Sequence, residues 1–157
     1  MMTGDVERHH AQLRAWAKGI YGLEAATELL IRGFDGRFAD PGCPWVHPTG
    51  SGHWIDFDAI PALMGALSGG EQRFLQIAAS LSGNDTEVNL GGALAGLDRT
   101  HLHLVLAGVA HASGTHEQQE LTVRADGTVA FARPGAIYRR DQTEPAETAC
   151  HPGGIGR

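Results

Sequence analysis

The stretch "ALSGGEQRFLQIAASL", residues 66–81, decides the fold class because it combines a helix start with an apolar helical face. Ser68 and Glu71 fit the S-x-x-E pattern of a capping box. In that motif the serine hydroxyl accepts a hydrogen bond from the glutamate N–H, and the carboxylate accepts one from the serine N–H. The apolar residues that recur at helical spacing are Phe74, Leu75, Ala78 and Leu81. The stretch therefore predicts a helix that starts after Ser68 and buries one face.

Helical patterns on both sides of this stretch extend the prediction to a mainly α fold. Helices are expected over residues 5–18, over 23–34, in short form over 56–67, and over one broken or two short stretches within 88–114. Gly19 and Gly22 interrupt the first two patterns, and Gly33 is the expected stop of the second. The expected buried stripe of the last segment consists of Leu102, Val105, Leu106, Val109 and Ala110.

The C-terminal third carries the only strand signal that we recognise. Residues 120–133, "ELTVRADGTVAFAR", hold two alternating runs around Asp126-Gly127, a preferred two-residue hairpin turn. The chain then becomes polar and rich in proline and glycine, which predicts a loose tail over residues 134–157. We expect a single compact helical domain, residues 1–133, that ends in a β-hairpin at about residues 120–133.

Residues 35–54 contain three prolines and four glycines, so no regular structure is expected there. Their aromatic residues would be costly to leave in water, which predicts an ordered loop packed over the helices. Two interpretations remain open. Phe38, Trp45 and Trp54 form a satellite core beneath the loop, or together with Arg37 they line a pocket or partner surface.

Composition excludes several classes of function. The 157 residues carry a formal net charge of −6, which argues against a general nucleic-acid binder. The N-terminus lacks the apolar core of a signal peptide, and no apolar run reaches the length of a membrane span. A cytoplasmic protein without a resident cofactor is expected. Cys43 and Cys150 are not expected to pair, because the second lies in the predicted tail.

Two short motifs resemble those of ATP-binding-cassette ATPases. The stretch from Leu67 to Phe74 is similar to the signature L-S-G-G-[EQ]-x-x-R, although Arg73 stands one place early. "AGLD" ends at Asp98, thirty residues after Ser68, and resembles the D-loop S-x-L-D. The resemblance implies that a nucleotide phosphate, held by another subunit, would be contacted by Ser68, Gly69, Gly70 and Asp98.

The rest of the cassette machinery is missing from the sequence. No G-x-x-x-x-G-K-[ST] loop occurs, and Lys18 stands in no glycine-rich loop. Gly91 and Gly92 occupy the places of the Walker B aspartate and the catalytic glutamate. Unaided ATP hydrolysis is therefore not expected, and the capping box alone explains the motif. As a whole the chain is similar to small uncharacterised proteins of GC-rich bacteria.

A metal site is the third possibility that the residues raise. Cys43, His47 and His53 carry side chains that bind zinc, but the spacing C-x3-H-x5-H matches no common zinc finger. Incidental histidines in an apolar loop are the alternative.

No complete catalytic set is present, so the sequence leaves open whether the protein is an enzyme and favours a non-catalytic role. The leading hypothesis is a non-catalytic cytoplasmic binding or adaptor protein that contacts a protein partner through residues 35–57. The alternatives are a nucleotide-sensing or ATP-site-completing module at the Ser68 helix start, and a small zinc protein at Cys43, His47 and His53.

Overall fold

The computed structural model describes residues 2–114, 120–123 and 125–132, and this part of the chain is mainly α-helical, as predicted. The helices are α1 (Met2–Ala17), α2 (Tyr21–Arg32), α3 (Ile60–Leu63), α4 (Gly69–Leu81), α5 (Leu90–Ala95) and α6 (Arg99–Ala112), and the 3-10 helix η1 (Gly33–Ala39) follows α2. The strands are β1 (Val46–Thr49), β2 (Gly52–Ile55), β3 (Glu120–Val123) and β4 (Val129–Ala132). Of these helices, none has both the length and the apolar character needed to cross a membrane.

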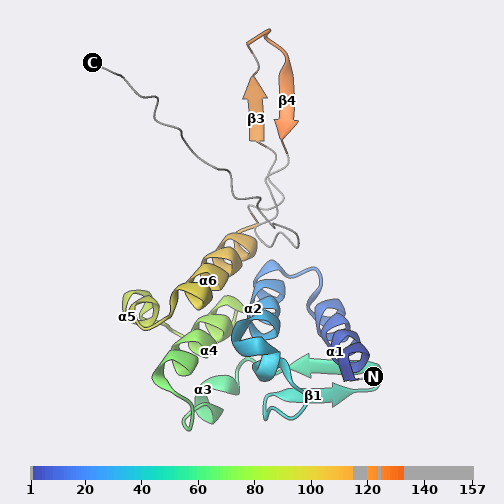
Figure 1. Cartoon of the computed structure of the whole chain (residues 1–157), viewed down its shortest axis with the longest axis vertical. Coiled ribbons are helices and arrows are strands. Elements are labelled where there is room, and N and C mark those ends of the chain that lie inside the picture. Colours follow the sequence, from blue (N-terminus) through green and yellow to red (C-terminus); the bar gives the residue numbers. More distant parts are fainter. Residues whose placement is uncertain (1, 115–119, 124, 133–157) are drawn as a thin grey trace, which may run out of the picture.

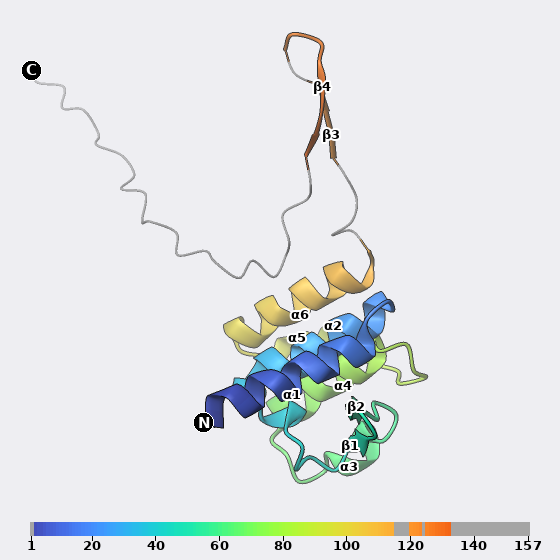
Figure 2. The same ribbon diagram turned by 90° about the vertical axis from the view of Figure 1, so that its right-hand side faces the viewer.

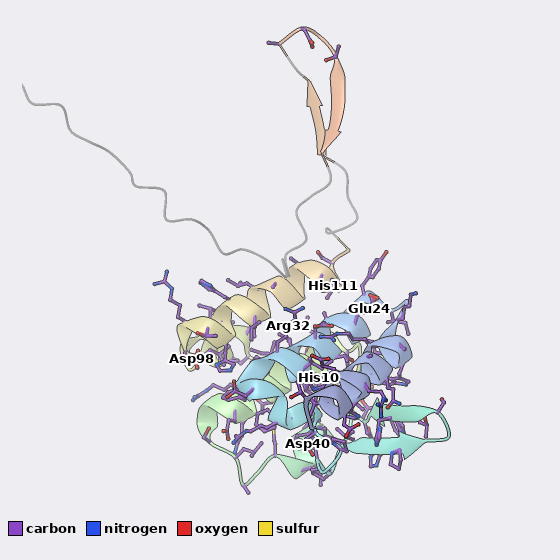
Figure 3. All side chains as sticks on the ribbon, turned by 45° about the vertical axis from the view of Figure 1, so that its right-hand side comes forward. His10, Glu24, Arg32, Asp40, Asp98 and His111 are labelled. Atoms are coloured by element: carbon purple, nitrogen blue, oxygen red, sulfur yellow. The ribbon has the colours of Figure 1, made fainter. Side chains whose placement is uncertain are left out.

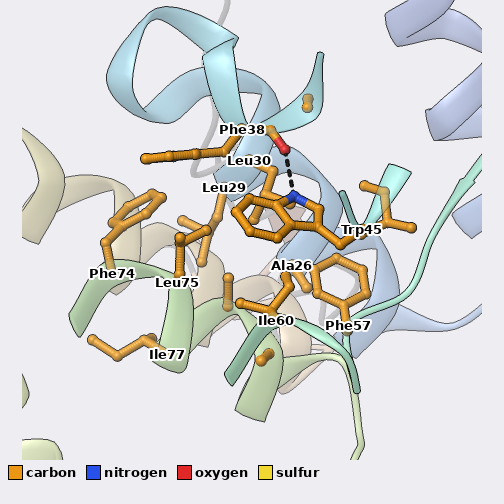
Figure 4. Packing of buried hydrophobic residues seen from close by; sticks show 14 of the residues in the cluster. Ala26, Leu29, Leu30, Phe38, Trp45, Phe57, Ile60, Phe74, Leu75 and Ile77 are labelled. Atoms are coloured by element: carbon orange, nitrogen blue, oxygen red, sulfur yellow. Dashed lines mark hydrogen bonds between the residues drawn. The ribbon is translucent and has the colours of Figure 1, made fainter. Parts of the chain in front are cut away.

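Helix α2 lies at the centre of the helical group. It contacts α1, α4 and α6, and Figures 1 and 2 show these helices around it from two directions. Its buried residues are Ala25, Ala26, Thr27, Leu29, Leu30 and Ile31, so more than one face is covered. A helix that is apolar over most of its circumference is stable in water only when neighbours surround it. The pattern of α2 therefore places it in the core (Figure 4).

Two glycines allow neighbouring elements to approach α2 closely. Gly33 ends α2 as predicted, and a Cβ at this position would overlap the ring of Phe74. Gly22 does not separate two helices as expected but lies inside α2, where a Cβ would overlap the carbonyl oxygen of Leu81. The separation comes from Gly19 alone, with a φ of 101°.

Residues 35–54 contain more regular structure than expected. β1 and β2 pair antiparallel, with Val46 opposite Ile55 and Thr49 opposite Gly52. These two strands were not predicted because Pro48 lies in the first of them, and proline has no N–H to donate to a strand ladder. The Asp56 N–H donates to the Trp45 carbonyl at 2.8 Å, so these two residues form a hydrogen-bonded pair. Hydrogen-bonded and non-hydrogen-bonded pairs alternate along an antiparallel ladder, which makes Pro48 and His53 a non-hydrogen-bonded pair. Pro48 consequently falls at a position that donates nothing across the pair.

Two aromatic residues of the same segment, Phe38 and Trp45, belong to the main core. Phe38 is 3% exposed and Trp45 is 3% exposed. The indole N–H of Trp45 donates to the Phe38 carbonyl at 2.8 Å, which satisfies the one polar atom of the buried side chain (Figure 4). The segment is thus an ordered part of the fold, and β2 packs it against α1.

The region 88–114 forms two helices, α5 and α6, but the expected buried stripe of α6 is partly wrong. Val105 is buried, whereas Leu106 is 54% exposed and Val109 is 43% exposed. The face that packs on α2 includes Gly108, which lies against Leu29. Because α6 is apolar on several sides, its sequence does not decide which side is covered.

Strands β3 and β4 pair antiparallel, with Glu120 opposite Ala132 and Val123 opposite Val129. The turn holds Gly127 at a φ of 78°, and the Asp126 carboxylate accepts from the Thr128 N–H at 2.9 Å. The tail expected over residues 134–157 lies outside the described residues.

Candidate functional site

The start of α4 is a capping box, as predicted. The Ser68 hydroxyl accepts from the Glu71 N–H at 3.4 Å, and the Glu71 carboxylate accepts from the Ser68 N–H at 3.0 Å. The same carboxylate forms an ion pair with Arg37. The helix start therefore already holds a negative charge, and the Ser68 N–H is occupied. Gly69 and Gly70 form the first turn, and Gly70 faces the carbonyl of Gly96.

Asp98 caps the start of α6, as Ser68 caps the start of α4. Its carboxylate accepts from the His101 N–H at 2.9 Å and lies 2.6 Å from the His101 Nδ1. The hydrogen bonds from the His101 backbone and ring lower the pKa of Asp98. The contact between Gly70 and Gly96 brings the α4 start and the α5–α6 connection together. Local capping interactions occupy the polar groups of Ser68 and Asp98.

The three metal candidates do not converge. His47 is opposite Trp54 and His53 is opposite Pro48, so the two histidines project from opposite faces of the β1–β2 hairpin. The Cys43 thiol donates to the Arg37 carbonyl at 3.1 Å. Burial, followed by the charge of Asp40, raises the pKa of Cys43, which disfavours the thiolate that zinc requires. Among the described residues no group of three or more potential ligands is arranged to hold a metal.

The aromatic candidates divide into two groups. Phe38 and Trp45 are core residues without a surface to offer a partner, and Arg37 lies over the Phe38 ring at 4.6 Å while it pairs with Glu71. Trp54 is only half-buried. Its ring lies 6.3 Å from that of Trp16 at the last turn of α1.

These two indoles form one side of a cavity of about 340 Å³. The cavity lies between the end of α1, the end of β2 and the loop after α4. Gly83 turns the chain out of α4 with a φ of 92°, and this turn brings Asn84 and Asp85 to the cavity. Asp56 and Asp58, which follow β2, complete its polar lining.

The charge of this cavity is one-sided. Asp56, Asp58 and Asp85 line it, and no lysine, arginine or histidine of the described residues does so. Asp56 accepts from the Ala59 N–H at 3.2 Å, but none of the three carboxylates forms an ion pair within the described chain. Carboxylates near aromatic faces attract cations through charge and through the ring quadrupoles.

The Asn84 amide adds a donor to this wall. Its Oδ1 accepts from the Thr86 N–H at 3.0 Å, and its Nδ2 is buried without a partner. Because this group donates, it does not contribute to holding a cation. The Ser82 hydroxyl instead donates to the Ala79 carbonyl at 2.7 Å, so it is not activated as a nucleophile. The features of this cavity that suit a cation are its three carboxylates and its two indole rings.

Sequence reasoning found Trp54 but missed its partners. Trp16 has the spacing of a core residue on its helix, and its neighbour across the cavity lies 38 positions later in the chain. Asp85 stands in a polar turn, where aspartate is common for conformational reasons. No local signal links these residues, because their proximity depends on how α1, β2 and α4 pack.

No protein-family model, curated protein or solved structure matches this chain. The resemblance to the cassette signature therefore stays a prediction from short motifs, and any function has to be argued from the site itself.

Proposed function

We propose that the protein is a non-catalytic, cytoplasmic binding protein that accepts a lysine or arginine side chain of a protein partner. The cavity beside Trp16 and Trp54 receives the cation. The observation that carries the proposal is the set of three carboxylates, Asp56, Asp58 and Asp85, without a counter-ion from the described chain.

The proposal agrees with the charge of the whole chain. A formal net charge of −6 steers basic partners toward the protein and repels acidic ones. An aliphatic stem that ends in a cation also suits the two walls, since the indoles cover the methylene groups while the carboxylates reach the charge. Residues 54–57 at this cavity are part of the segment 35–57 that the sequence indicates as a contact surface.

Capped tripeptides of glycine, a central residue and glycine provide the direct test. We expect saturable binding when the central residue is lysine or arginine, and no binding when it is norleucine, which has the stem without the charge. Tryptophan fluorescence detects binding, because two of the three tryptophans line the cavity. Added salt is expected to weaken binding, because the attraction is between charges at a solvent-accessible site.

A pair of double variants separates this cavity from general acidity. Asp58→Asn with Asp85→Asn is expected to abolish lysine-peptide binding. Asp5→Asn with Glu7→Gln, two exposed positions of α1, removes the same charge elsewhere and is expected to leave binding unchanged. Equal binding of the norleucine peptide, or equal loss in both double variants, would contradict the proposal.

A further inference from the structure

A second, smaller cavity lies between α1, α2 and α6, away from the acidic cavity. Its volume is about 150 Å³, and it is lined by Arg14, Ala17, Glu24, Thr27, Glu28 and His111. Figure 3 shows Glu24 of α2 and His111 of α6 next to each other at its edge. A ligand here would contact the consecutive helices α1 and α2 and also α6, which follows much later in the chain.

The charged groups around this cavity already satisfy one another. Glu28 accepts from Arg14 Nε at 2.5 Å and from Arg32 Nε at 2.7 Å, and a second Arg14 nitrogen lies at 3.3 Å. The Glu24 carboxylate lies 3.2 Å from the His111 Nε2. Glu28 thus pairs with two guanidinium groups, and Glu24 pairs with an imidazole. A charged ligand would disturb these pairs, so the cavity favours a neutral one.

The Thr27 hydroxyl is the polar group that lacks a partner. Thr27 is 1% exposed, and its Oγ1 is buried without a hydrogen bond to any residue that the structure describes. A threonine inside a helix commonly donates to the carbonyl four residues earlier, and Thr27 does not use that acceptor. A buried hydroxyl without a hydrogen bond is unfavourable, so a ligand that bonds to it gains a specific interaction.

The size of the cavity limits what that ligand is. An apolar cavity of about 150 Å³ holds a single benzene ring in another protein. Here Ala17 and the aliphatic stems of Arg14 and Glu28 offer apolar surface, and Thr27 offers one hydrogen-bonding group. We propose that this cavity binds a neutral, single-ring aromatic molecule with a hydroxyl or ring N–H that hydrogen-bonds to Thr27. The inference is independent of the proposed cation site.

Phenol and benzene are suitable probes, because they share a ring and differ in the hydroxyl. In amide-resolved NMR titrations of the full chain, we expect phenol to shift resonances of α1, α2 and α6 around the cavity. Phenol is also expected to raise the melting temperature, since it binds the folded state. Benzoate and benzylammonium, which carry a charge, are expected to bind more weakly than phenol.

Thr27→Val keeps the side-chain shape and removes the hydroxyl. It is expected to weaken phenol binding by about tenfold while leaving benzene unaffected. Thr100→Val, at an exposed position of α6, is the matched control and should leave both affinities unchanged. Ala17→Val, which narrows the cavity, is expected to weaken both ligands. The inference is overturned if phenol causes no shift up to its solubility limit, or if Thr27→Val binds phenol as tightly as the unsubstituted protein.

Discussion

His101 accepts a hydrogen bond at 3.1 Å from the backbone N–H of Phe34, a residue 67 positions earlier in the chain. Because a backbone N–H can only donate, the His101 Nε2 carries no proton, and the proton on Nδ1 is shared with Asp98 at 2.6 Å. The two rings also stack at 3.9 Å with an angle of 18°. Phe34 and Asp35 have φ values of 49° and 57°, a conformation that side-chain-bearing residues rarely adopt. His101 therefore stabilises the strained backbone at Phe34 and Asp35, near the start of η1.

His101→Phe tests this role, because it keeps the stacked ring and removes both hydrogen bonds. We expect the free energy of unfolding to fall by about 1–3 kcal/mol, the cost of a buried donor left without an acceptor. Urea denaturation monitored by circular dichroism measures it. His103→Phe, at an exposed position of the same helix, should change the stability by less than about 0.5 kcal/mol. Equal effects of the two variants would show that the bond to Phe34 contributes nothing.

Glu28 predicts an acid sensitivity with a defined sign. Burial alone would raise its pKa, but hydrogen bonds from Arg14 and Arg32 outweigh burial and lower the pKa of Glu28 below the ordinary value of 4.5. A carboxylate with a lowered folded-state pKa contributes stability that is fully present above the unfolded-state pKa. That stability is lost as the pH falls through the folded-state value.

Accordingly, the melting temperature of the unsubstituted protein should fall between about pH 4.5 and more acidic values, in part because of Glu28. Glu28→Gln should have a lower melting temperature at pH 7 and a flatter dependence on pH below that window. Glu7→Gln, exposed on α1, serves as the control and should retain the slope of the unsubstituted protein. If Glu28→Gln kept the pH dependence of the melting temperature of the unsubstituted protein, Glu28 would not contribute to the acid sensitivity.

Gly33 should not tolerate alanine, for reasons of space and not of backbone angle. Its φ of −76° suits any residue, but a Cβ would overlap the Phe74 ring. We expect Gly33→Ala to cost about 1–3 kcal/mol by overpacking. Phe74→Leu should recover part of that loss, so the double variant is more stable than the sum of the single effects indicates. Strict additivity in chemical denaturation would contradict the packing explanation.

Ser68→Ala distinguishes helix capping from nucleotide contact. Loss of the cap should lower the stability by about 1 kcal/mol. Ser51→Ala in the exposed β1–β2 turn is the control and should have little effect. Because Ser68 and Glu71 satisfy each other, ATP is expected to leave the melting temperature unchanged in both proteins. An ATP-dependent increase that disappears in Ser68→Ala would favour the nucleotide alternative instead.

The sequence by itself determined the features that depend on near neighbours. The capping box is complete within four residues, and apolar residues recur at helical spacing within residues 66–81. Helix α4 could therefore be predicted from its own stretch of sequence. The end of α2 at Gly33 was also predicted from the sequence, although the close contact of Gly33 with Phe74 joins residues far apart in the chain. The apolar pattern also predicted a mainly α fold, because apolar residues at helical spacing form one face that is buried when the helix packs against its neighbours.

Only the tertiary structure decided which distant residues meet. The β1–β2 pairing overrode the breaker signals of Pro48 and its neighbouring glycines, since a two-stranded pair leaves positions that need no donor. Packing between elements far apart in the chain determines the covered side of α6, the contact of Trp16 on α1 with Trp54 on β2, and the cavity at Thr27. Such contacts depend on how the surfaces of whole elements pack together, and no short stretch of sequence specifies that packing.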